Sequence, residues 1–465
     1  MRERNSRMLT EGPVWRLMLS FSLPLMLSSI FQQLYGAVNI VFLGRFASAE
    51  ALAGAGNGST LIYALNSMFL GLSTGGMIVL GRFFGAKDDE RSAKTVGNVI
   101  LLQAAAVALT MGLIFVFGKA LIRLINVPGA GGGSVGADTE AWNYMRICAF
   151  GLIFNAGYNI VSSVLRAIGN SAAPMVFVVV SCCVNVLLDY VFVGVLRRGA
   201  SGAATATVIA QAASFLLSML YLFWRKLPFS VKLSDLRPSR NTMVSIFKLG
   251  LPISLQSILN ILSFTVIAAI INGMGLFYSA ANGVVNNLMN FYFVIPIAIG
   301  QALSAFSAQN IGAGKPDRAK QGLRICIIAS LAIAVPCTVL ASFWPTPIAS
   351  LLASDPDVIT ASAQFLIPYS WDCIFVGCVF CINGFLNSCG LTAFVAAHET
   401  AAAFLVRIPV TWLMSRVAGA TLFHVGIGTP AATLASLIIC FVYYKVRLSR
   451  GRLSSVMSAM SGSGA

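Results

Sequence analysis

The chain has 465 residues, of which 57% are hydrophobic and 10% are charged, and its formal net charge is +16. A water-soluble protein carries roughly 25% charged residues, so this chain has too little polar side-chain surface to cover a soluble fold. The composition excludes a soluble globular protein and indicates a membrane protein whose exterior faces lipid.

Twelve apolar runs follow one another along the chain, each long enough to cross a bilayer and separated from the next by a polar or Gly/Pro-containing break. We expect spans at Leu17–Leu43, Ala51–Leu80, Val96–Phe117, Trp142–Leu165, Ala173–Leu196, Ala200–Phe223, Val244–Asn272, Tyr278–Ala308, Leu323–Phe343, Ala361–Leu386, Ala393–Ser415 and Ala418–Tyr444. The pattern predicts an all-α polytopic membrane protein of twelve transmembrane helices.

Basic residues between the spans and at their membrane ends are distributed unevenly over the two sides of the membrane. One side collects Arg2, Arg4, Arg7, Arg16, Arg82, Lys87, Arg91, Lys94, Arg166, Arg225, Lys226, Lys232, Arg237, Arg240, Lys248, Lys315, Arg318, Lys320, Arg324, Lys445, Arg447, Arg450 and Arg452. The other side has Arg45, Lys119, Arg123, Arg146, Arg197, Arg198, Arg407 and Arg416. Cytoplasmic loops carry the excess of Lys and Arg, so both termini are expected in the cytoplasm. The basic residues are then topology signals and contacts to anionic lipid, and nucleic acid is not an expected partner.

The expected spans contain no set of residues that is typical of a catalytic or metal-binding site. All ten Cys residues fall inside apolar runs, as buried small hydrophobic residues do, and the CxxC pair Cys378 and Cys381 has no second pair to complete a metal site. His398 and His424 are the two His residues of the chain, and no HExxH or paired aspartate motif lies in a span. We expect no catalytic residues, no metal site and no cofactor other than a coupling cation.

The two halves of the chain resemble each other. FSLPLML at Phe21–Leu27 matches LGLPISL at Leu249–Leu255, GAKDDERSAK at Gly85–Lys94 matches GAGKPDRAK at Gly312–Lys320, and LRAIGNS at Leu165–Ser171 matches LNSCGLT at Leu386–Thr392. Each half contains six spans, so the repeat is parallel, with an axis along the membrane normal and a cleft between two pseudo-symmetric six-helix bundles. We place the first bundle at residues 1–223, a basic cytoplasmic linker at 224–243, the second bundle at 244–447 and a cytoplasmic tail at 448–465.

An ionisable side chain at bilayer depth is costly and therefore a candidate for function. Asp189 lies in the middle of the fifth span, four residues after Asn185, which puts both on one helical face. The Asn185 amide is able to stabilise either protonation state of the carboxyl, and Thr207 lies at similar depth in the sixth span. In the first span Gln32, Tyr35 and Asn39 form a polar stripe that faces the bundle interior, for function or as interhelical contacts.

Several motifs together resemble the multidrug and toxic compound extrusion (MATE) family of the MOP flippase superfamily. The resemblance covers nearly the whole chain, and its carriers are Leu9–Phe46, Gly71–Glu90, Leu165–Met175, Asn185–Phe192 and Val406–Ser415. It implies a V-shaped pair of six-helix bundles that exports cationic or amphipathic drugs and metabolites by alternating access, in exchange for protons or sodium ions. It also implies a bacterial cytoplasmic (inner) membrane location, and we expect a monomer.

The resemblance further implies a coupling site. Proton-coupled members use a network that matches Tyr35, Asn185, Asp189 and Thr207, with an acid in the first helix that Asn39 replaces here. Asp189 would then couple alone. Sodium-coupled members carry acids where this chain has Asn260 and Val376. Asp372, one turn earlier than Val376, either substitutes for an acid there or lies near the outer interface.

The implied substrate pocket is apolar with a few polar orienting groups, for which we expect Gln32, Tyr35, Asn66, Asn155, Asn159 and Met175. One buried negative charge favours lipophilic cations, and we expect proton rather than sodium exchange. An alternative is a lipid-linked oligosaccharide or polysaccharide flippase of the same superfamily. Such a flippase would need a strongly cationic cavity, and the spans hold few Arg or Lys residues.

Overall fold

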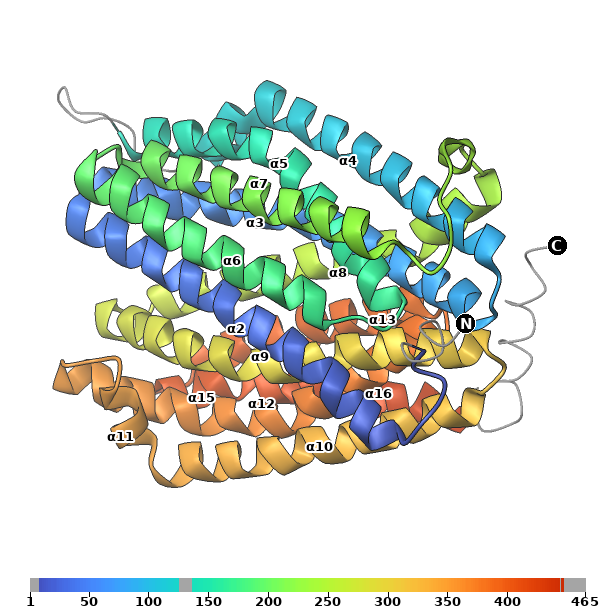
Figure 1. Ribbon diagram of the computed structural model, residues 1–465. Coiled ribbons are helices and arrows are strands. Elements are labelled where there is room, and N and C mark those ends of the chain that lie inside the picture. Colours follow the sequence, from blue (N-terminus) through green and yellow to red (C-terminus); the bar gives the residue numbers. More distant parts are fainter. Residues whose placement is uncertain (1–7, 125–135, 444, 447–465) are drawn as a thin grey trace. The chain divides into compact units, whose positions relative to one another are not determined.

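A computed structural model describes residues 8–124, 136–443, 445 and 446, and the described residues form helices and no strand (Figure 1). Twelve helices or interrupted helices are long and apolar enough to span a membrane, which confirms the predicted spans. They are α2 (Val14–Phe46), α3 (Ala49–Gly85), α4 (Asp89–Leu124), α5 (Ala137–Ala167), α6 (Ala172–Asp189) with η1 (Tyr190–Val195), α7 (Gly199–Arg225), α8 (Arg240–Asn272), α9 (Leu276–Gly312), α10 (Pro316–Phe343), α12 (Pro356–Ser388), α13 (Thr392–Ala401) with η3 (Ala402–Arg407) and α14 (Ile408–Ser415), and α15 (Leu422–Gly426) with α16 (Gly428–Tyr443).

Two short elements, η2 (Leu233–Leu236) and α11 (Pro345–Ser350), lie outside the spans. The predicted cytoplasmic tail at 448–465 lies outside the described residues, as do Arg2, Arg4, Arg7, Arg447, Arg450 and Arg452.

The polar turns of the internal repeat have the same backbone conformation in both halves. Gly169 ends α5 with φ +88° and Gly390 ends α12 with φ +83°, a left-handed conformation that glycine adopts without strain. The Asn170 N–H donates to the Leu165 carbonyl at 2.8 Å, and the Leu391 N–H donates to the Leu386 carbonyl at 3.0 Å. The matched sequences thus form matched helix ends, and the similarity of the halves extends to their polar loops.

The chain divides into two compact units whose boundaries lie inside helices. The first unit is Leu27–Ser254 together with Met8, and the second unit is Leu9–Met26 together with the described residues from Leu255 onward. The boundaries fall just after Pro24 in α2 and just after Pro252 in α8. The bundle boundaries expected from the sequence stay a prediction. The first unit contains the second half of α2 and the first half of α8, and the second unit contains the first half of α2 and the second half of α8.

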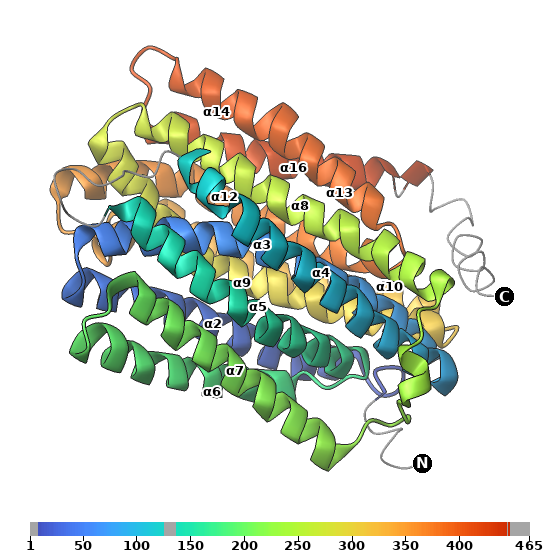
Figure 2. The ribbon, with the colours of Figure 1, turned by 90° about the horizontal axis from the view of Figure 1, so that it is seen from above.

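The first unit is built around α5, which packs against α3, α4 and α7 (Figures 1 and 2). Its apolar core includes Phe69, Ile114, Met145 and Leu152, which are at most 1% exposed. The start of α8 is held close to α3 because Gly71 and Gly75 on α3 meet Gly250 and Ser254 on α8. Small residues spaced by four on both helices let their backbones approach each other.

The second unit is built around α12, which packs against α9, α10, α15 and α16 (Figure 1). The segment before α2 is tied to it by hydrogen bonds. The Leu9 N–H donates to the Gln309 Oε1 at 2.9 Å, and the Asn310 Nδ2 donates to the Leu9 carbonyl at 3.1 Å. The Arg318 Nη2 donates to the Gly12 carbonyl at 3.0 Å, and the Arg318 Nε donates to the Asn310 Oδ1 at 3.1 Å. These bonds fix the start of α2 on the second unit.

We expect Asn310→Ala to destabilise this attachment. Asn310 is 0% exposed, and the change leaves the buried Leu9 carbonyl without its side-chain donor, a loss that costs about 1–3 kcal/mol. A lower unfolding temperature and faster proteolysis near Leu9 in the purified protein are the measurements. Asn241→Ala, at an exposed position near the start of α8, is the matched control and should change neither. Equal stability of the two variants would contradict the attachment.

Candidate functional site

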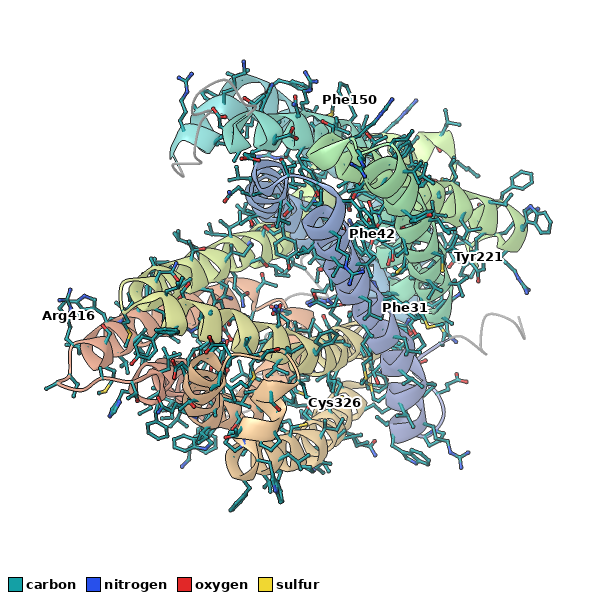
Figure 3. All side chains as sticks on the ribbon, turned by 90° about the vertical axis from the view of Figure 1, so that its left-hand side faces the viewer. Phe31, Phe42, Phe150, Tyr221, Cys326 and Arg416 are labelled. Carbon is teal, nitrogen blue, oxygen red and sulfur yellow. The ribbon has the colours of Figure 1, made fainter. Side chains whose placement is uncertain are left out.

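Asp189 ends a regular helix at the point where the backbone widens. The start of α6 is fixed by Asn170, whose Oδ1 accepts from the Ala173 N–H at 3.1 Å and whose Nδ2 donates to the Tyr221 hydroxyl at 2.9 Å. After Asp189 the helix continues as the π-helical turn η1, a form that occurs frequently at functional sites. The Tyr190 ring meets the Phe42 ring of α2 edge-on, with centroids 6.4 Å apart, and Phe42 is labelled on α2 in Figure 3.

The carboxyl of Asp189 is buried without a hydrogen-bond partner. Asp189 is 0% exposed, and neither of its oxygens has a partner among the described residues. Asn185, one turn earlier and 1% exposed, likewise has no partner for its amide oxygen or nitrogen, nor has the Thr207 Oγ1 on α7. Buried polar groups are normally hydrogen-bonded, so these unpaired polar atoms call for a ligand, a proton or water.

Two tyrosines from neighbouring helices lie within electrostatic range of Asp189. They are Tyr35 on α2 and Tyr144 on α5, which also interact with each other. Tyr144 is hydrogen-bonded to Cys148, one turn further along α5. No ion pair joins Asp189 to a Lys or Arg among the residues that the structure describes. Helices α2, α5 and α6 thus bring hydroxyl and thiol groups to a carboxyl without a permanent counter-ion.

Tyr144 and Cys148 were missed in the sequence, although a signal was present. Asn155 and Asn159 were chosen on the same helix, and counting back from Asn155 by three and then by fours reaches Leu152, Cys148 and Tyr144. These positions share one face of α5 because the α-helix repeats every 3.6 residues. The polar stripe therefore continues from the asparagines to the neighbours of Asp189.

The remaining predicted site residues of the first unit differ in exposure and in whether their polar atoms have hydrogen-bond partners. The Oδ1 atoms of Asn39 on α2 and Asn66 on α3 are buried without a partner. Asn159 instead donates its Nδ2 to the Asn155 side chain, so these two amides satisfy each other in part. Gln32 is exposed and Met175 is half-buried. All of these residues belong to the first unit, together with Asp189.

Asp372 and Arg407 of the second unit are buried, whereas the sequence allowed both of them to lie at the outer side of the membrane. Asp372 on α12 is 2% exposed and is hydrogen-bonded to Thr433, so it does not reach water at the outer interface. Arg407 had been counted among the residues of the outer side, but it is 7% exposed at the end of η3. It lies inside the expected span Ala393–Ser415, where the sequence suggests a residue at the membrane end, and the helix continues beyond it as α14. Arg407 is therefore a buried cation and not a topology signal.

A cavity of about 360 Å³ in the second unit does not form part of this site. It is lined by apolar or aromatic residues of α13 and α16 together with Val446, namely Phe394, Ile438, Ile439, Val442, Tyr443 and Val446. This cavity offers no carboxyl or basic group to a ligand. We therefore take the unpaired carboxyl of Asp189 as the centre of the candidate site.

Comparison with known proteins agrees with the two-half, twelve-helix architecture. The sequence profile of the MatE family matches residues 24–191 and 252–413, one stretch in each half of the chain. The chain belongs to the MATE family. It is therefore a transporter and not an enzyme, and a multi-pass membrane protein that handles small molecules.

Individual MATE proteins are similar to it over nearly their whole length. The probable multidrug resistance protein YoeA of Bacillus subtilis is 29% identical, with 93% of this chain and 94% of YoeA covered. The multidrug export protein MepA of Staphylococcus saprophyticus is 24% identical, with 93% and 94% covered. A crystal structure of MATE in complex with MaL6 superposes with a TM-score of 0.86 at 18% identity, covering 97% of this chain and 98% of that one. The predicted all-α MATE fold is confirmed.

Proposed function

We propose that this protein is a secondary active efflux transporter that exports cationic or amphipathic drugs and metabolites in exchange for protons. Its relatives YoeA and MepA are named for multidrug resistance and multidrug export, which supports the substrate class. The observation that carries the proposal is the carboxyl of Asp189, which is buried at mid-span without an ion pair or hydrogen bond in the described structure.

The exchange follows from the cost of an isolated charge. An ionised carboxylate in apolar surroundings lacks the hydration that it has in water, and either a bound proton or a bound organic cation relieves that cost. A proton that binds Asp189 from the outside removes the negative charge and releases the organic cation to the outside. The proton then leaves to the cytoplasm, and the carboxylate takes up the next cation there. One proton enters for each cation exported.

The neighbours of Asp189 suit both ligands. The rings of Tyr35 and Tyr144 offer aromatic faces, which attract organic cations. The unpaired Oδ1 atoms of Asn39 and Asn66, in the same unit, are available to accept a hydrogen bond from a polar substituent. Asn39 does not titrate, so in this proposal Asp189 exchanges the proton without a second carboxyl from α2. Gln32, Asn155, Asn159 and Met175 complete the proposed substrate pocket.

We further propose a monomer in the bacterial cytoplasmic membrane with both termini in the cytoplasm, on the basis of the loop charges. The flippase alternative is not favoured. A pyrophosphate-linked substrate needs a cationic cavity, and the groups that interact electrostatically with Asp189, Tyr35 and Tyr144 in the described structure are tyrosines and cysteines rather than Lys or Arg.

Transport in proteoliposomes tests the proposal. A fluorescent organic cation is loaded, and a pH gradient and a sodium gradient are imposed separately. We expect the pH gradient to drive transport above the rate of protein-free liposomes, because the carboxyl exchanges protons, and the sodium gradient to have no effect. Transport driven by sodium alone at uniform pH would refute proton exchange while leaving efflux itself intact.

A further inference from the structure

The second unit contains its own set of charged side chains inside its spans, of which Asp372 and Arg407 are buried and Glu399 is half-buried. Asp372 lies on α12, Glu399 on α13 and Arg407 at the end of η3, and electrostatic interactions link Arg407 and Glu399 to Asp372 and Arg407 to Glu399. Glu399 accepts from the Asn383 Nδ2 at 2.8 Å, and Asp372 accepts from Thr433. Two carboxyls therefore face one guanidinium inside a membrane-spanning bundle.

Arg407 is held in place without closing an ion pair. Its side chain is 7% exposed, and neither Nε nor Nη1 has a hydrogen-bond partner in the described structure. The Cζ atom lies 4.6 Å from the centroid of the Phe264 ring of α8, a cation–π contact. The Oδ1 of Asp372 is also buried and unpaired. The guanidinium thus stabilises the negative charge of the carboxyls electrostatically, without a direct hydrogen bond to them.

Other groups around the cluster are polar but bring no second permanent charge. The Tyr369 hydroxyl of α12 interacts with both Asp372 and Arg407. His398 contacts the Ser436 Oγ through Nδ1 at 2.9 Å and the Asn383 Oδ1 through Nε2 at 3.2 Å. Asn383 in turn joins His398 to Glu399. Arg407 is the permanent cation in this set, because a guanidinium keeps its proton in proteins.

Without Arg407, the carboxyls of Asp372 and Glu399 would have to be protonated or bound to a mobile cation. Buried carboxylates are stable when they are paired, protonated or bound to a cation, and removal of one partner of a buried charge pair leaves an uncompensated charge. We propose that Arg407 is a tethered cation, whose guanidinium takes the place of a mobile cation beside Asp372 and makes the transporter indifferent to sodium. The proposal rests on proton exchange as the proposed coupling reaction, and it identifies the residue that determines ion specificity.

Sodium binding by the purified protein tests this independently of transport. The unfolding temperature is measured in sodium chloride and in choline chloride at equal ionic strength. The wild type is expected to unfold at the same temperature in both salts. Arg407→Gln is expected to gain a saturable sodium-specific rise of roughly 2 °C or more, because a ligand that binds the folded state stabilises it. Asp372→Asn in the Arg407→Gln background should abolish the rise.

Arg407→Lys keeps the positive charge and should remain indifferent to sodium, like the wild type. A sodium-specific rise in the wild type or in Arg407→Lys overturns the proposal, as does a folded Arg407→Gln protein without such a rise. If Arg407→Gln does not fold, the wild type and Arg407→Lys still decide, because the proposal requires both to be indifferent. Failure of the proposed function would instead appear in the proteoliposome assay, as pH-driven transport that is absent or that does not need Asp189, while the unfolding temperatures still follow the pattern expected for Arg407.

Discussion

Asp189→Asn is expected to abolish export of an organic cation driven by a pH gradient. The amide has nearly the shape of the carboxyl but binds and releases no proton at physiological pH, so the exchange step is lost. The measurement is the initial rate of fluorescent-cation transport in proteoliposomes under an imposed pH gradient, and we expect the rate to fall to that of protein-free liposomes. Folding should be preserved, since the Asp189 oxygens form no hydrogen bond that the change would break.

The matched control for this variant is Asp317→Asn. The Asp317 side chain is 91% exposed and pairs with Lys320 on the surface of α10 at 3.0 Å, an interaction worth at most about 1 kcal/mol. It makes the same chemical change outside the site and should leave transport unaltered. Undiminished pH-driven transport by Asp189→Asn, with the variant present in the liposomes at the level of the wild type, would remove Asp189 from the mechanism.

The transmembrane fold could be predicted because each helix carries its own signal. Apolar runs of sufficient length identified the twelve spans, and the paired turns at Gly169 and Gly390 were visible as matched sequence. The π-helical turns η1 and η3 were not predicted. A π turn differs from the surrounding α-helix by one inserted residue, which packing against neighbouring helices stabilises and hydropathy does not register.

The candidate site could be predicted in part for the same reason. Asp189 stands out because a carboxyl in an apolar run is rare, and Asn185 follows from helical spacing. Tyr144 and Cys148 are ordinary residues for a span, and their role depends on which helices lie next to α6. Arg407 was misplaced because charge near the end of an apolar run indicates a side of the membrane but not a depth. The roles of Tyr144, Cys148 and Arg407 became clear only from the burial of their side chains and from the groups with which they interact.

Gly75→Ala is expected to destabilise the first unit, because α3 and the start of α8 have no room for a side chain between them. A Cβ atom at Gly75 would lie 2.7 Å from the Ile246 carbonyl oxygen and 2.8 Å from the Gly250 nitrogen. Both contacts are to backbone, which cannot rotate away, so the helices must separate. Overpacking of this kind costs about 1–3 kcal/mol, measurable as a lower unfolding temperature in detergent. The corresponding change at Gly71, where a Cβ meets Ser254 and the Gly250 carbonyl, should add to the loss.

Gly56→Ala provides a control with the opposite expected sign. Gly56 lies on the same helix, and a Cβ there meets no atom within 4 Å. Alanine in place of glycine within a helix stabilises it by roughly 0.5–1 kcal/mol, so the unfolding temperature should stay level or rise. A fall of equal size in both variants would mean that α3 tolerates no substitution for general reasons. A fall confined to Gly75→Ala, with reduced transport, would show that the close contact of α3 with the first half of α8 is part of the working transporter, since that half of α8 belongs to the first unit.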